Sequence, residues 1–227
     1  MAFPEVPQRL AGVRETIARH QSASGWTHPV RVVAVTKGHG PAAVRAAADA
    51  GLRDVGENRV QEALPKQDAV APLLLEWHLI GTLQRNKVRQ VVGRFGLIHS
   101  VDRLELALEL DRRNVGPRQP VLIQVNCSGE PQKGGVDPDE LPRLLDAVQP
   151  LTGIEVRGLM TMAALTDDPG EQRRAFRQLR LLRDRAAQAG HLLPELSMGM
   201  SGDYPIAVEE GATMVRLGTV LFGERER

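Results

Sequence analysis

The sequence has little lysine, a single cysteine and no long apolar run, and each scarcity excludes a class of protein. Of its 29 basic residues only four are lysines, namely Lys37, Lys66, Lys87 and Lys133. The one cysteine, Cys127, excludes an intrachain disulfide and fits a reducing cytoplasm. A net charge of +1 argues against nucleic-acid binding, and no segment approaches the ~20 apolar residues that cross a bilayer. We therefore expect a cytoplasmic protein that binds neither nucleic acid nor membranes.

The composition is that of one globular domain. The 227 residues are 42% hydrophobic and 25% charged, which is ordinary for a folded domain. The first turns carry Glu5, Arg9 and Arg14, so we expect no signal peptide. No linker rich in proline or serine divides the chain, and we expect a single domain over residues 1–227.

Short apolar segments alternate with longer amphipathic segments along the whole chain. Strands are predicted at 31–36, 53–56, 76–80, 96–99, 120–125, 154–160, 195–198 and 214–218. Helices are predicted at 4–22, 41–50, 59–70, 84–93, 103–114, 138–149, 170–189 and 204–211, with a short final helix after the last strand. Strands rich in Val, Ile and Leu that are separated by helices are typical of a parallel sheet covered by helices.

Eight such strands favour one fold class. We predict an α/β fold with a single (β/α)8 barrel of the TIM type and an extra N-terminal helix, although about 250 residues is more usual for such a barrel. A doubly wound open sheet is the alternative. In a barrel, functional residues lie at the C-terminal ends of the strands, and polar residues follow nearly every strand predicted here.

Lys37 ends the first apolar strand and is the first candidate for chemistry. An amine that is partly desolvated in a barrel mouth loses its proton more readily and can attack an aldehyde. Arginine, which supplies most of the positive charge, cannot form an imine at ordinary pH. The alternative is a lysine whose stem packs on the strand end while its ammonium reaches solvent. The scarcity of lysine favours the nucleophile.

The loops after the last two predicted strands indicate a phosphate site. Barrels commonly bind phosphate with these two loops, through backbone N–H groups and small residues. Here the first loop brings Ser201, and the second brings Gly218 for close approach and Thr219 for a hydroxyl. A Gly/Ser turn alone is more often a helix cap, but the presence of such residues at both strand ends favours phosphate.

Four further residues are candidates to contact the same ligand. Arg216 lies two residues before Gly218, so strand alternation can direct it into the mouth, where it would hydrogen-bond a ring nitrogen without protonating it. A salt bridge between Arg216 and Glu57 or Glu224 is an equal alternative. Asn58 and His78 are candidates to pack on the cofactor, although His78 can equally be a satisfied core histidine. Met200 is placed with them beside Ser201, although methionine more often fills a core. No Cys/His spacing predicts a metal site, and no residue is assigned a catalytic role.

With these residues identified, the chain resembles the YggS/PROSC family of pyridoxal phosphate homeostasis proteins. The shared motifs are AVTK (34–37), GEN (56–58), WHLIGTLQRNK (77–87), HSVD (99–102), GLMTM (158–162), LSMGMSGDYPIAVEEG (196–211) and VRLGTVLFGER (215–225). The resemblance runs nearly end to end. It implies a barrel like the N-terminal domain of alanine racemase, with pyridoxal 5'-phosphate (PLP) as an internal aldimine on Lys37. Ser201, Gly218 and Thr219 would hold the phosphate, Arg216 would face the pyridine nitrogen, and Asn58 would lie beside the ring.

Three functions are compatible with these residues. The first, which the resemblance favours, is a PLP carrier without turnover, acting in PLP homeostasis and delivering it to apo-enzymes by exchange of the imine. The second is a PLP-dependent racemase, which needs a base on each face of the substrate; the only tyrosine, Tyr204, follows the phosphate loop. The third is a cofactor-free Schiff-base lyase or aldolase, which would explain Lys37 but not Arg216. We expect a monomer or a weak homodimer.

Overall fold

Eight parallel strands form a closed barrel in the computed structural model, which describes residues 3–224. The strands are β1 (Arg31–Val35), β2 (Asp54–Glu57), β3 (Glu76–Leu79), β4 (Leu97–Val101), β5 (Gln119–Gln124), β6 (Ile154–Met160), β7 (Glu195–Ser197) and β8 (Met214–Leu217). Each strand pairs with the next, and β8 pairs with β1 from Arg31↔Met214 to Ala34↔Leu217. The predicted barrel is therefore confirmed, and the open sheet is excluded.

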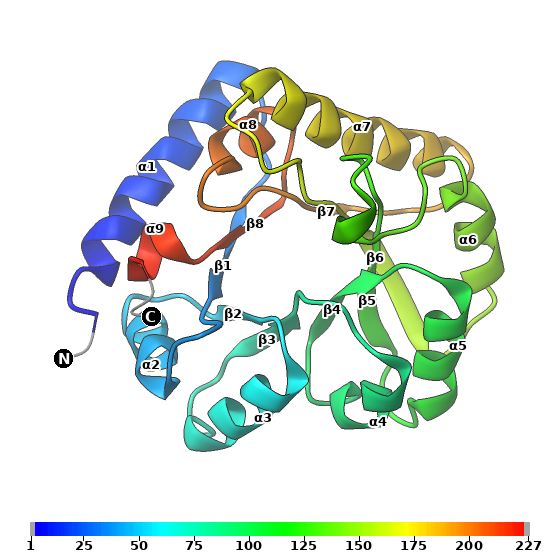
Figure 1. Ribbon diagram of the computed structural model, residues 1–227, viewed down its shortest axis with the longest axis horizontal. Helices are drawn as coiled ribbons and strands as arrows, with labels where there is room; N and C mark the ends of the chain where they lie inside the picture. The colour runs from blue at the N-terminus through cyan, green and yellow to red at the C-terminus, as the bar shows by residue number, and fades with distance from the viewer. Residues whose placement is uncertain (1–2, 225–227) are drawn as a thin grey trace.

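Helices surround the strands on the outside of the barrel (Figure 1). They are α1 (Val6–Ser24), α2 (Pro41–Asp49), α3 (Val60–Ala69), α4 (Val88–Val91), α5 (Leu104–Arg113), α6 (Leu141–Val148), α7 (Pro169–Gln188), α8 (Tyr204–Glu209) and α9 (Thr219–Phe222), with 3-10 turns η1 (Arg85–Lys87) and η2 (Pro131–Lys133). The prediction of one helix over 84–93 is wrong in detail, because this segment begins as the 3-10 turn η1 and becomes helical only for α4. No helix of residues 3–224 is long and apolar enough to span a membrane.

Side-chain alternation along the strands divides the apolar residues between two layers. Inside the barrel, a small cluster contains Val33, Leu97, Leu122, Met160 and Met214. The larger cluster fills the layer between strands and helices, where Val32 and Ala34 lie on the opposite face of β1 from Val33. The apolar cluster inside the barrel is small, which leaves room in the interior for the polar residues described below.

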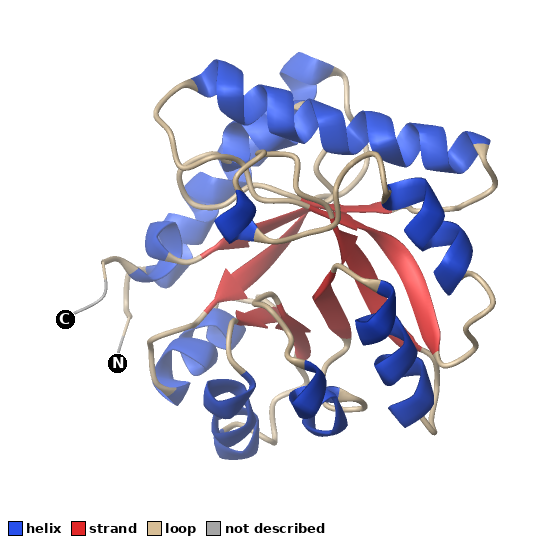
Figure 2. Cartoon of the chain, turned by 45° about the vertical axis from the view of Figure 1, so that its right-hand side comes forward, coloured by secondary structure: helices blue, strands red, loops and turns tan. Residues whose placement is uncertain are grey.

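The N-terminal helix α1 covers the junction where β8 closes on β1 (Figures 1 and 2). Its buried stripe includes Leu10 and Val13, at the spacing of one helical face. Just after it, the Trp26 indole N–H donates to the Glu209 carbonyl at the end of α8, at 2.8 Å. Phe3 packs edge-on against Phe222 of α9, so segments from both ends of the sequence lie side by side at the C-terminal ends of the strands.

Candidate functional site

A cavity of about 580 Å³ lies at the C-terminal ends of the strands. Seven of the eight predicted site residues line it, namely Lys37, Asn58, Met200, Ser201, Arg216, Gly218 and Thr219. They come from the ends of β1, β2, β7 and β8 and from the first residue of α9. The structure thus brings together residues separated by up to 182 positions in sequence, from Lys37 to Thr219, while it places the eighth, His78, elsewhere.

A buried ionic cluster fixes the backbone just before Lys37. Thr36 donates from its hydroxyl to Glu57 Oε1 at 2.5 Å. Lys66 of α3 donates to the same carboxylate oxygen at 2.6 Å and to the Thr36 carbonyl at 2.9 Å. Burial raises the pKa of Glu57, although its hydrogen bonds to Lys66 and Thr36 act against that rise. The cluster joins the end of β1 to the end of β2, so it positions both Lys37 and Asn58 at the edge of the cavity.

The loop after β7 owes its shape to Gly199. This residue has φ of +91°, and a Cβ there would lie 2.6 Å from the Ala207 Cβ, so glycine is required by both backbone conformation and packing. The Met200 N–H then donates to Asp203 Oδ1 at 2.5 Å, which closes the turn before α8. Burial raises the pKa of Asp203. This tight turn brings Ser201 to the cavity.

Two backbone N–H groups converge on one oxygen atom at this side of the cavity. The N–H groups of Gly218 and Val220 donate to Ser201 Oγ at 3.2 and 3.3 Å. A Cβ at Gly218 would meet no described atom closer than 3.5 Å, so the packing of the chain does not itself demand glycine there. Convergent donors, a hydroxyl and an uncluttered backbone are what an oxyanion such as a phosphate monoester needs.

Arg216 reaches the cavity from β8 with its position fixed by two hydrogen bonds. Its Nη1 donates to Ser197 Oγ at 2.7 Å, and its Nη2 donates to the Thr161 carbonyl at 3.0 Å. Only 4% of the residue is exposed. Burial lowers the pKa of the guanidinium to about 10, and the nearby Asp203 acts in the opposite direction. The alternative salt bridge to Glu57 is not formed, because Glu57 is bonded to Lys66 and Thr36.

His78 lies inside the barrel rather than at the cavity. Its side chain is fully buried, with Nε2 2.9 Å from Asp54 Oδ1 and Nδ1 2.9 Å from His99 Nε2. The structure therefore places His78 apart from the residues that line the cavity, where the alternative of a satisfied core histidine describes it. The sequence could not separate the two, because the position near a strand end does not say how deep in the barrel the ring lies.

Two other residues have structural roles next to the cavity. The Asn126 side chain folds the loop after β5, donating to the Glu130 carbonyl at 3.1 Å and accepting from the Gly129 N–H at 3.1 Å. Burial raises the pKa of the Cys127 thiol to about 12, which makes it unreactive at neutral pH. Within residues 3–224 there is no group of three or more His, Cys, Asp or Glu side chains arranged to hold a metal ion.

The cavity also includes residues that the sequence analysis missed. Gln124 and Lys133 line it, and the Gln124 amide donates to the Lys133 carbonyl at 2.8 Å. Lys133 in turn pairs with Glu130 at 2.8 Å and donates to the Ala163 carbonyl. The scarcity of lysine was a signal that could have found Lys133, since two of the four lysines face this one cavity.

Comparison with known proteins gives a consistent result. The family model for the N-terminal domain of alanine racemase matches residues 10–226. A pyridoxal phosphate homeostasis protein of Aquifex aeolicus is 44% identical over 223 residues, covering 96% of this chain and 98% of that protein. The solved structure of PipY from Synechococcus elongatus with PLP bound is 42% identical, with a TM-score of 0.85 over 96% of this chain and 100% of that one. Alanine racemase from Corynebacterium glutamicum shares the fold, with a TM-score of 0.74 at 20% identity over 92% of this chain and 61% of that one.

Proposed function

This chain belongs to the pyridoxal phosphate homeostasis proteins, and from that premise we propose that it binds PLP through an imine on Lys37 and delivers it without turning over a substrate. The observation that carries the proposal is a single cavity with an amine on one side and convergent oxyanion donors on the other. The related PipY has been solved with PLP bound. We further propose that the protein acts in the cytoplasm as a monomer or weak homodimer and that its partners are apo-enzymes that use PLP.

The residues around the cavity fit such a ligand in size and chemistry. Lys37 would supply the amine for the aldehyde, and Ser201, Gly218 and Thr219 would supply donors for the phosphate. PLP, when bound, supplies an aldehyde that exchanges reversibly between amines. The site would therefore hold the aldehyde on Lys37 until an incoming amine displaces it.

Arg216 argues for storage rather than catalysis. A guanidinium has no acceptor atom and cannot give up its proton at neutral pH, so it would leave a pyridine nitrogen unprotonated. A ring in this state is a weaker sink for electrons. With Ser197 and Thr161 holding both terminal nitrogens, Arg216 has little freedom to move away.

The position of Tyr204 also disfavours a racemase. A racemase needs a second base opposite the lysine, and Tyr204 is the only tyrosine in the sequence. It is only 7% exposed at the start of α8 and does not line the cavity within residues 3–224. A carrier needs no second base, so a cavity that Tyr204 does not line suits delivery better than a racemisation in which tyrosine is the second base.

The test is the near-visible absorption spectrum of purified protein with added PLP, before and after borohydride reduction, for the wild type and Lys37→Ala. We expect an imine band in the wild type that borohydride fixes at Lys37 and that the variant lacks. Lys133→Ala is the matched control, because Lys133 lines the same cavity; peptide mapping should still find the label on Lys37. Absence of the band in the wild type would contradict PLP binding, and sustained consumption of any amino acid that is lost in Lys37→Ala would contradict a pure carrier.

A further inference from the structure

An unbroken chain of side-chain hydrogen bonds runs through the barrel interior from its floor to the cavity. It starts at Asp54 Oδ1, which lies 2.9 Å from His78 Nε2. His78 Nδ1 lies 2.9 Å from His99 Nε2, and His99 Nδ1 lies 2.9 Å from Ser197 Oγ. Ser197 Oγ finally accepts from Arg216 Nη1 at 2.7 Å. Its three middle members are fully buried.

The two ends of this chain determine the direction of every bond in it. Arg216 can only donate, so Ser197 accepts from it and gives its own proton to His99 Nδ1. His99 then donates from Nε2 to His78 Nδ1, and His78 donates from Nε2 to the Asp54 carboxylate. In this arrangement each proton is used once, and both rings carry their proton on Nε2.

The opposite direction leaves buried groups unsatisfied. If His99 donated from Nδ1, Ser197 would receive two donors and its own proton would need a third partner. Within residues 3–224, Ser197 Oγ has only Arg216 and His99 as hydrogen-bond partners, and an unpaired buried hydroxyl is costly. Burial, followed by the proximity of His78 and Arg216, holds the pKa of His99 well below its ordinary value, in agreement with a neutral ring.

We propose that Asp54, His78, His99 and Ser197 are positioning residues that orient the Arg216 guanidinium toward a ligand ring in the cavity. The proposal rests on the proposed PLP function only for the identity of the ligand, because the hydrogen bonds from Asp54 to Arg216 are present in the protein without a ligand. Arg216 would otherwise be held by the Thr161 carbonyl alone. The Ser197 bond fixes the second nitrogen and with it the plane of the guanidinium.

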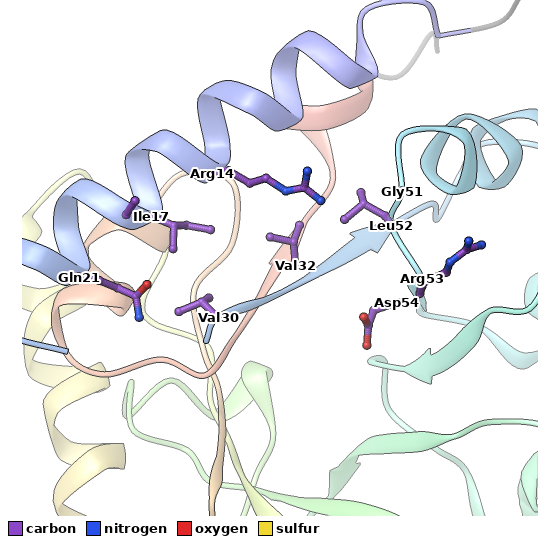
Figure 3. Close-up of a pocket in the computed structure, with 10 residues that line it drawn as sticks. Arg14, Ile17, Gln21, Val30, Val32, Gly51, Leu52, Arg53 and Asp54 are labelled. Atoms are coloured by element: carbon purple, nitrogen blue, oxygen red, sulfur yellow. The ribbon is translucent and has the colours of Figure 1, made fainter. Parts of the chain in front are cut away.

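The floor of the barrel fixes the other end of the chain. Asp54 also faces Arg31 at 3.4 Å, and Arg31 faces Glu195 at 3.0 Å. Asp54 lies at the edge of a cavity of about 330 Å³ between α1 and the N-terminal ends of β1 and β2 (Figure 3). The carboxylate side chain is 19% exposed, so the floor end of the hydrogen-bond chain reaches solvent although its three middle residues are fully buried.

The first test uses nuclear magnetic resonance of the protein without PLP, with ¹⁵N-labelled histidine. We expect both His78 and His99 to be protonated on Nε2 and bare on Nδ1 at neutral pH. Asp54→Ala should shift the ring resonances of His99, which Asp54 does not touch, whereas Asp49→Ala on the exposed face of α2 should leave them in place. A protonated Nδ1 on either ring, or His99 resonances unmoved by Asp54→Ala, would overturn the proposal.

The second test measures ligand binding with 4-deoxypyridoxine phosphate, which has the ring and the phosphate of PLP but no aldehyde. Ser197→Ala should weaken its binding about tenfold, as expected for one lost hydrogen bond to a charged group, while binding of inorganic phosphate stays constant. Ser197→Thr, which keeps the hydroxyl, should restore much of the affinity. Thr213→Val is the matched control. Thr213 Oγ1 accepts from the Leu196 N–H at 2.8 Å, so it links β7 to the start of β8 without belonging to the hydrogen-bond chain.

The outcomes separate this proposal from the proposed function. Equal affinity of the wild type and Ser197→Ala for the analogue would overturn the positioning role, as would an equal loss in Thr213→Val. Failure of the wild type to bind the analogue at all would count against PLP as the ligand, while the tautomers of the two histidines would still decide whether the chain of bonds exists.

Discussion

The mouth of this barrel and the interior beneath it are both polar, but they use polar groups in different ways. In the interior, polar side chains serve as one another's hydrogen-bond partners, in a chain that begins at Asp54 and ends at Arg216. At the mouth, Lys37 and Thr219 line a cavity open to a ligand. Interior residues should therefore affect stability and orientation, whereas mouth residues should affect binding.

The two lysines on either side of this boundary illustrate the difference. Lys66 is 7% exposed and is bonded to Glu57 and the Thr36 carbonyl. Lys37, one residue beyond Thr36, is half-buried and faces the cavity. The same residue type serves as a buried structural ion in one place and as the candidate nucleophile in the other, and only the surroundings distinguish them.

The largest loss of stability is expected for Lys66→Met. Removing the ammonium leaves the Glu57 carboxylate buried without its cationic partner, which costs about 3–5 kcal/mol in comparable cases. We expect the free energy of unfolding in urea to fall by an amount in that range. The double variant Glu57→Gln/Lys66→Met should recover most of it, because no buried charge remains. A loss below about 1 kcal/mol for Lys66→Met would show that the cluster is not what holds this edge of the mouth.

A smaller loss is expected for Gly199→Ala, in the loop that carries Ser201. The substitution places a Cβ at a φ of +91° and 2.6 Å from the Ala207 Cβ. We expect a loss of about 2–3 kcal/mol in the free energy of unfolding, together with weaker phosphate binding. Gly190→Ala is the matched control, because Gly190 has φ of +93° and no described atom lies within 4 Å of the place its new methyl group would take. It should lose only about 1 kcal/mol, and equal losses in both variants would refute the importance of the Ala207 contact.

Much of the fold and of the mouth was predictable from the sequence, and the interior was not. The alternation of apolar strands with helices predicts the barrel directly. Lys37 lies two residues after β1, Ser201 four residues after β7, and Arg216 one residue before the end of β8, so all three are near strand ends. The position of His78 inside the barrel could not be predicted in this way. Its contact with His99 depends on the register between β3 and β4, which no local sequence pattern encodes. The role of Lys66 depends likewise on how α3 packs over β2.

The free energy of unfolding should depend on pH because of the interior residue His99, with an effect of intermediate size. The pKa of His99 is held well below 6.5, chiefly by burial. Below pH 6.5 the unfolded chain therefore binds a proton at this residue that the folded protein does not, and the folded state loses stability as the pH falls, by up to about 1.4 kcal/mol per pH unit.

The measurement is the slope of the unfolding free energy between pH 6.5 and pH 5, compared between the wild type and His99→Gln. Glu57 and Asp203, whose pKa values are raised by burial, act with the opposite sign in both proteins, so only the difference in slope reports His99. We expect the wild type to lose stability more steeply on acidification. Equal slopes would mean that His99 takes up its proton in the folded state as readily as in the unfolded one.

The smallest change in stability is expected for Ser201→Ala, at the mouth. Its Oγ accepts two N–H groups at 3.2 and 3.3 Å, but these donors lie beside the cavity, where water can replace the hydroxyl. We expect unfolding in urea to change by less than about 1 kcal/mol, while affinity for PLP falls about tenfold through loss of a phosphate contact. Ser128→Ala, in the loop after β5, should change neither quantity appreciably. A Ser201→Ala protein that binds normally but unfolds easily would place Ser201 with the interior and remove the distinction between the two regions.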